Sequence, residues 1–248
     1  MTKVGGGLVC TAYFTAALVT DVNTSNIKAT SFPEEWRKRI EGYARECNLR
    51  QKGVKCKREV IDFWFGPPGS PERGRRRDLW FAKQSASKSD FDDEIFKRFN
   101  PSVEAAFAGQ LDHWKYSVDG SLALCLLLDQ FPRNIHRGTA QAFSGDSKAI
   151  EISKLVVASG WLEDLGTQAR KFLIMPFQHA EDLPIQEQGI TLFSALCGDE
   201  DGERSYNAMV KHRDLIATYR RFPHRNKALG RTNTPEEEEY LKDPDAGF

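Results

Sequence analysis

The 248-residue sequence has no excess of charge of either sign, because 35 Lys and Arg residues balance 35 Asp and Glu residues. A chain without net charge has no overall field that would draw it to a nucleic acid or a membrane surface, so any such binding requires a local patch. Its hydrophobic content of 40% is ordinary for a globular protein. The length suffices for one large domain or two small ones.

The sequence also lacks the motifs of several common enzyme classes. Five cysteines are scattered along the chain without the spacing of zinc ligands, so no metal is expected. No Gly-rich phosphate loop, dinucleotide-binding motif or Ser-His-Asp pattern is present, and we expect no cofactor. Scattered thiols are typical of a reducing compartment, which favours a cytoplasmic protein.

Apolar runs long enough to span a membrane are absent as well. Residues 8–19 are apolar and match the roughly 7–15 residues of a signal-peptide core, but they are too short for a bilayer. One preceding Lys and a poor cleavage site favour an N-terminal extension, with an export signal as the alternative. We expect residues 1–55 to form this extension, partly disordered, and we expect no membrane partner.

What the sequence does contain is helical patterning. Phe91, Ile95 and Phe99 recur at the spacing of one helix face. Residues 122–128 are apolar, rich in Leu and free of β-branched residues, which favours a buried helix over a strand. Further helices are predicted over residues 33–49, 146–159, 168–179, 185–196 and 203–221. The sequence therefore predicts an all-α protein, a helix-hairpin array or compact bundle, with residues 56–248 as a single domain.

Two similar segments, DQFPRNIHR at residues 129–137 and RRFPHRN at residues 220–226, stand out. Pro132 and Pro223 are expected to end helices, because proline lacks an N–H and clashes with the preceding turn. The polar residues around them are our candidates for substrate binding: Asp129, Arg133, Asn134, His136, Arg137, Arg221, His224, Arg225 and Asn226. Arginine forks suit phosphate or carboxylate. The alternative is that these groups satisfy helix carbonyls and pair with nearby acids.

Residues 175–187 (MPFQHAEDLPIQE) supply the candidates for acid–base catalysis: His179, Glu181 and Asp182. Carboxylates beside an imidazole shift one another's pKa, as a general acid or base requires. The alternative is that Asp182 caps the next helix and His179 packs as a polar core residue. We also expect the two Phe-Pro segments to face one another across a shared pocket, with Glu181 within reach of an arginine.

A basic loop, ERGRRRDLWF at residues 72–81, places four arginines before two aromatic side chains. Such a loop can lie along a nucleic-acid backbone. Most runs of this kind are solvated loops, and the sequence leaves both interpretations open.

Together, the stretches VIDFWFGPPGSP, LALCLLLDQFPRNIHRGTAQAF, FLIMPFQHAEDLPIQEQ and RFPHRNKALGRTNTPEE resemble domain-of-unknown-function family 924. The resemblance runs from about Val60 to the end and implies a tetratricopeptide-like helical fold. The chain is also similar, more distantly, to fungal arginine-containing cyclodipeptide synthases. That similarity implies a small anionic or aminoacyl substrate and tRNA as a partner. The arginines would hold the tRNA 3′ end, the acids near His179 would bind a guanidinium, and His179 or Glu181 would accept the α-amino proton.

A non-catalytic function is the alternative. Helix-hairpin arrays commonly present a groove to peptides, and the basic clusters would then hold the carboxylate end of a peptide partner.

Overall fold

A computed structural model describes residues 33–81, 86–163, 165–243 and 246–247. These residues form helices and turns without a strand, which confirms the all-α prediction. The apolar stretch at residues 8–19 lies outside the described residues. The chain divides into two compact units, residues 1–52 and residues 53–248.

The described part of the first unit is helix α2 (Glu34–Gln51). It begins directly after Pro33 and carries Glu34 and Glu35 in its first turn, where acids interact favourably with the free N–H groups. The helix predicted over residues 33–49 is confirmed, with Pro33 as its N-cap.

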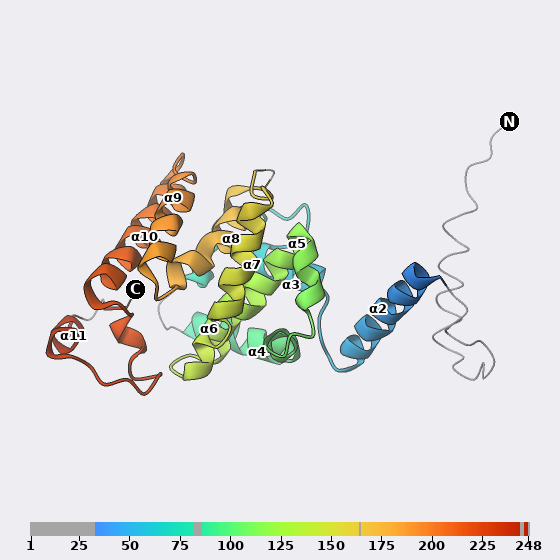
Figure 1. Ribbon diagram of the computed structural model, residues 1–248, viewed down its shortest axis with the longest axis horizontal. Coiled ribbons are helices and arrows are strands. Elements are labelled where there is room, and N and C mark those ends of the chain that lie inside the picture. Colours follow the sequence, from blue (N-terminus) through green and yellow to red (C-terminus); the bar gives the residue numbers. More distant parts are fainter. Residues whose placement is uncertain (1–32, 82–85, 164, 244–245, 248) are drawn as a thin grey trace. The chain divides into compact units, whose positions relative to one another are not determined.

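The second unit is a succession of helices joined by short segments (Figure 1). The α-helices are α3 (Lys57–Phe65), α4 (Ala86–Phe107), α5 (Val118–Cys125), α6 (Phe131–Ile135), α7 (Asp146–Ala158), α8 (Thr167–His179), α9 (Leu183–Ser194), α10 (Glu200–Tyr219) and α11 (Pro235–Tyr240). One π-helical turn, η4 (Leu126–Gln130), and the 3-10 segments η2 (Asp78–Trp80), η3 (Asp112–Tyr116), η5 (Ala140–Phe143) and η6 (Pro223–Arg225) lie between them.

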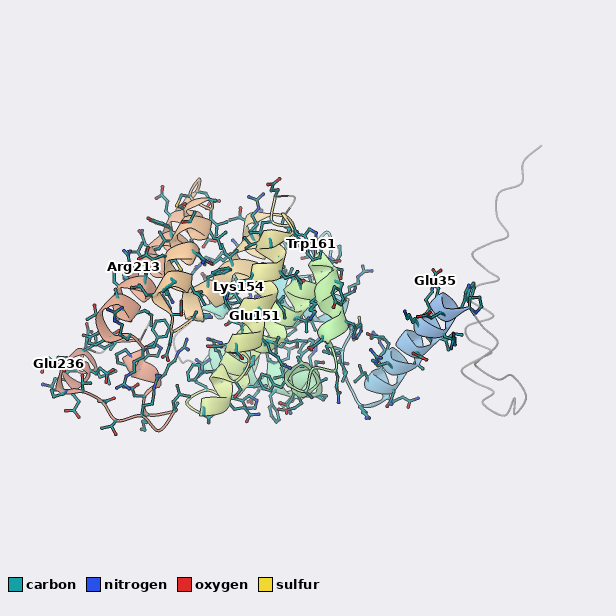
Figure 2. All side chains as sticks on the ribbon, in the orientation of Figure 1. Glu35, Glu151, Lys154, Trp161, Arg213 and Glu236 are labelled. Atoms are coloured by element: carbon teal, nitrogen blue, oxygen red, sulfur yellow. The ribbon has the colours of Figure 1, made fainter. Side chains whose placement is uncertain are left out.

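Consecutive helices pack on one another in the second half of this unit. Helix α7 contacts α8, α8 contacts α9, and α9 contacts α10, and Figure 1 shows α9 and α10 side by side. An ion pair between Arg213 and Glu187, 2.9 Å apart, joins α10 to α9, and Figure 2 labels Arg213 on its helix. These neighbours form the predicted helix-hairpin arrangement.

Helix α8 is held by apolar contacts on two sides. Phe172 packs edge-on against Trp64 of α3 and Trp80 of η2, with ring centroids 5.4 and 4.8 Å apart. Phe177 belongs to a second cluster with Phe193 of α9 and other buried residues of α7 and α10. The polar residues of α8 are therefore fixed in position by the packing of their neighbours.

The prediction that Pro132 ends the buried helix is wrong. The Phe131 N–H donates to the Leu126 carbonyl, five residues back, so the chain makes one π-turn before α6 begins. Pro132 then occupies the first turn of α6, where its missing N–H breaks no helical hydrogen bond. The helical path ends at Ile135 instead. The prediction that Pro223 ends the second helix is also wrong, because α10 ends at Tyr219, where Arg220 follows with a φ of 64°. Pro223 instead begins η6.

Among the residues that the structure describes, no helix is both long enough and apolar enough to cross a membrane.

Candidate functional site

A cavity of about 400 Å³ opens between α6, α8, α10 and the segment that ends at η2. Its lining combines bases, two histidines, amides and aromatic rings: Arg76, Trp80, Phe81, Gln130, Arg133, Asn134, Arg137, Lys171, Met175, Gln178, His179, Arg204, Ser205, Ala208 and His212. Of the predicted site residues, the structure places Arg133, Asn134, Arg137 and His179 in this lining.

His179 and Asp129 form a hydrogen-bonded pair at one wall of the cavity. His179 Nδ1 lies 2.6 Å from Asp129 Oδ1. Asp129 belongs to the π-turn and is fully buried, and Gln130 donates a further hydrogen bond to its carboxylate. Because His179 lines the cavity and turns Nδ1 toward the buried acid, the Nε2 edge is the one available to a ligand.

The charges around this pair fix the form of the imidazole. Burial raises the pKa of Asp129, but Arg133 and His179 more than offset this, so the net shift is downward and the carboxyl is ionised. Burial and the charge of Arg133 lower the pKa of His179 against the opposing effect of Asp129. An ionised carboxylate can only accept, so the proton sits on Nδ1 and Nε2 is a free base near neutral pH.

The charged side chains that line the cavity are all basic: Arg76, Arg133, Arg137, Lys171 and Arg204. Their carboxylate partners lie behind or beside the lining. Arg133 contacts Asp146 through two hydrogen bonds of 2.8 and 2.9 Å, and Arg137 contacts Asp92 at 2.9 Å. A cavity of this kind favours an anionic ligand.

The second Phe-Pro segment lies behind this site and does not line it. Arg225 is buried, and it donates to Asp146 Oδ2 at 3.0 Å and to the His179 carbonyl at 3.1 Å. Arg133 binds the same Asp146. The two segments therefore meet through one shared carboxylate, whereas the sequence predicted that they face one another across a pocket.

Glu181 binds Arg231 through hydrogen bonds of 2.6 and 2.9 Å and accepts from the Phe222 N–H. The expected reach of Glu181 to an arginine is confirmed. Asp182 is the N-cap of α9 and accepts from the Ile185 N–H at 2.9 Å. Both carboxylates have partners inside the protein, and neither lines the cavity.

The remaining predicted residues have separate surroundings. Arg221 binds Glu237 at 2.6 Å, and Asn226 donates to the same carboxylate at 3.1 Å, which anchors α11. His224 lies beside the Phe222 ring, with centroids 5.5 Å apart. His136 follows α6 and is not in the cavity lining.

The arginines of the basic loop make two kinds of contact. Arg77 donates to the carbonyls of Phe63 and Trp64, and Arg73 donates to the Gly66 carbonyl. These contacts satisfy the open end of α3. Arg76 instead lines the cavity and binds Asp201 of α10 at 3.2 Å.

Apart from His179, sequence reasoning missed the contributions of α8 and α10. Lys171, Met175 and Gln178 follow one stripe of α8, and Arg204, Ala208 and His212 follow one stripe of α10. The available signal was the occurrence of Lys171 and Gln178 on an otherwise apolar buried face, since charged residues are rarely buried without a partner.

A larger cavity of about 690 Å³ lies between α3 and α4 and has no histidine or lysine in its lining. Several of its acids are paired with arginines, as Asp62 is with Arg73 and Glu94 with Arg98. It offers no oriented base, so the smaller cavity is the better candidate.

Acid is expected to destabilise the protein through its buried histidines. Burial, then Arg225, lowers the pKa of His224 to about 4 in spite of Glu181, and the pKa values of His179 and His212 are lowered too. The unfolded chain therefore takes up protons first as pH falls below about 6.5, and stability is lost between that pH and about 4. His224 alone accounts for about 3 kcal/mol of this loss.

Chemical denaturation at several pH values measures this effect. His224→Leu should remove up to about one proton from the pH dependence of stability. His113→Leu, at an exposed position of η3, should leave it unchanged. A stability that is flat between pH 6.5 and 4 would contradict the prediction.

Comparisons with known proteins give the chain a family. Residues 60–245 match the profile of DUF924, described as a bacterial protein of unknown function. A solved structure of a protein of unknown function, ATU0120 from Agrobacterium tumefaciens, is 35% identical, and the match covers 75% of this chain and 97% of that one, with a TM-score of 0.65. No functionally curated protein matches, so the similarity to cyclodipeptide synthases gains no support. Because the family match spans most of its length, the chain belongs to the DUF924 family.

Proposed function

We propose that the protein is an enzyme that uses His179 as a general base on an anionic substrate held in the 400 Å³ cavity. The observation that carries the proposal is the contact of 2.6 Å between His179 and the buried Asp129. A buried carboxylate that fixes the tautomer of a histidine leaves the opposite nitrogen ready to accept a proton. This nitrogen adjoins a cavity whose charged lining is entirely basic.

An aminoacyl group delivered on tRNA is the specific substrate that the sequence resemblance supplies. The α-amino group of one aminoacyl ester would attack the carbonyl carbon of a second, so that a C–N bond forms and the C–O bond to the tRNA 3′ oxygen breaks. His179 would accept the amine proton at Nε2 and return it to the departing oxygen. A second attack of the same kind would close a cyclic dipeptide, with arginine as one of its residues.

The proposal assigns this proton transfer to His179 and not to Glu181 or Asp182. Glu181 makes two hydrogen bonds to Arg231, and Asp182 is occupied as a helix cap. A carboxylate already held by an arginine is a weak base, because the ion pair stabilises its charged form.

The test is mass spectrometry of the small molecules that accumulate in cells expressing the protein. Cells with the wild type should accumulate a new product, and a cyclic dipeptide containing arginine would identify the specific reaction. His179→Asn should abolish the product, while His113→Asn, an exposed histidine on η3, should retain it. Equal profiles for the wild type and His179→Asn would overturn the proposal.

A peptide-binding module is the second candidate, favoured by the same basic lining, which suits a C-terminal carboxylate. It predicts that a peptide co-purifies with the wild type and with His179→Asn alike, and that no small-molecule product appears in either culture.

A further inference from the structure

Three cations from three separate elements line the cavity, two of them beside Asp201 of α10 and the third three residues further along that helix. Arg76 comes from the segment before η2, Lys171 from α8, and Arg204 from the first turns of α10. The Arg76 guanidinium and the Lys171 ammonium lie 4.4 and 4.7 Å from the centre of the Phe81 ring.

Lys171 is the unusual member of this group. It is only 3% exposed, and its ion-pair partner is Asp201, 3.5 Å from Nζ. Asp201 is shared, because Arg76 binds it at 3.2 Å and Gln168 at 2.7 Å. An ammonium group can donate three hydrogen bonds, so this buried charge is under-compensated.

The third cation, Arg204, adds to the excess of positive charge in this part of the cavity. Its partner Glu200 is 88% exposed, and an ion pair with so much solvent contact is weak. Among the described residues, Asp201 is the carboxylate that Arg76 and Lys171 share, and the other partner of Arg76, Asp78, is 3.8 Å away and fully exposed.

We propose that Arg76, Lys171 and Arg204 form a subsite for a phosphoryl group of the substrate. A phosphoryl dianion presents three oxygens in a tetrahedral arrangement and carries enough charge to offset the excess. A carboxylate carries only one negative charge and would offset less of this excess than a dianion does. The inference rests on the proposed function in taking this cavity as the substrate site, and it adds that the substrate is phosphorylated.

The protonation of Lys171 supplies a readout of its own. Burial lowers the pKa of Lys171 to about 8, with Asp201 opposing and Arg76 lowering it further. A bound dianion would raise this pKa again, because it stabilises the charged amine. Anion binding at pH 8 should therefore draw protons onto the protein.

Isothermal titration with sulfate tests the subsite without any catalytic assay. Sulfate has the shape of a phosphoryl dianion and does not itself titrate near pH 8. The wild type should bind it with net proton uptake, measured in two buffers of different ionisation enthalpy. Lys171→Met should weaken binding by about 10-fold or more, which corresponds to the loss of one charge-assisted hydrogen bond, and should abolish the proton uptake.

Two further variants keep the result independent of folding. Arg204→Met changes an exposed side chain and should weaken binding without affecting stability. Lys154→Met, on α7 in Figure 2 and outside the cavity lining, should leave binding intact. Binding that is absent in the wild type, or unaffected by both Lys171→Met and Arg204→Met, would overturn the inference, as would acetate binding as tightly as sulfate.

Competition then identifies the source of the phosphoryl group. Displacement of sulfate by AMP indicates a small phosphate ester, and displacement by a 5′-phosphorylated RNA trinucleotide alone indicates a nucleic-acid end. Displacement by neither contradicts a phosphorylated substrate. Because no product is measured, these titrations can fail while the His179 experiment succeeds, and the reverse.

Discussion

Asp129→Asn is expected to destabilise the protein by about 3–5 kcal/mol, the usual cost of breaking a buried ion pair from one side. Asp129 is fully buried, and its carboxylate contacts His179 at 2.6 Å and Arg133 at 3.0 Å. With its NH2 group at the position of Oδ1, an asparagine amide would turn N–H groups toward Arg133, which is itself a donor. The substitution would therefore remove one acceptor and create a clash of donors.

The same substitution should change the tautomer of His179. The asparagine amide can donate to Nδ1, which moves the proton to Nε2 and removes the free base from the cavity. In a histidine-dependent enzyme such a change costs up to about 10⁴-fold in rate. Nitrogen NMR of the imidazole measures the tautomer directly, and denaturation measures the stability.

Asp182→Asn is the matched control for this variant. Asp182 is the exposed N-cap of α9, and asparagine caps a helix as well as aspartate does. The stability of the Asp182→Asn variant and the tautomer of its His179 should stay as in the wild type. If Asp129→Asn proves as stable as this control and leaves Nε2 unprotonated, the pair has no orienting role.

The helices could be predicted from the sequence because their signals are local. Apolar spacing, as in Phe91, Ile95 and Phe99, and caps such as Thr234 before α11 depend on neighbours within one turn. The effect of Pro132 on the helix cannot be predicted from its neighbours in sequence, because it depends on the packing of distant residues. The π-turn before it exists within a packed core, where the Gly145 backbone lies against the Leu128 carbonyl so closely that a Cβ would come within 2.1 Å.

The site was predictable only where its residues are close in sequence. Arg133, Asn134 and Arg137 share one short segment, and His179 lies in a polar cluster at the end of α8. Lys171 and Arg204 are 33 residues apart in the sequence, and no local pattern predicts that both line one cavity. The ion pair of Lys171 with Asp201 of α10 likewise joins residues distant in sequence. Bringing them together requires the packing of α8 beside α10.

The repeated Phe-Pro segment now has a physical explanation with two unequal parts. Both copies supply an arginine to Asp146, through Arg133 in the first and Arg225 in the second. Arg133 also contacts Asp129 and lines the cavity, whereas Arg225 is enclosed between the rings of Phe143 and Phe222 at 4.6 and 4.5 Å. The first copy belongs to the site and the second supports it.

Arg133→Met should therefore cost more stability than Arg225→Met. Loss of Arg133 leaves the buried Asp129 carboxylate without its cation, at about 3–5 kcal/mol. Loss of Arg225 leaves Asp146 with both hydrogen bonds from Arg133. Burial and the nearby charge of Arg133 lower the pKa of Arg225 to about 10, so its removal also relieves a repulsion. A methionine between the two rings should cost about 1–3 kcal/mol, chiefly for the unsatisfied His179 carbonyl.

Denaturation of both variants, with sulfate titration of each, measures the difference between the two copies. Arg133→Met should lose stability and weaken anion binding, because its guanidinium lines the cavity. Arg225→Met should retain anion binding to within about 3-fold, since no atom of Arg225 belongs to the lining, and the expected cost lies in stability alone. Equal losses of stability and of binding in the two variants would mean that the copies are equivalent. The division into a cavity-lining arginine and a supporting one would then be wrong.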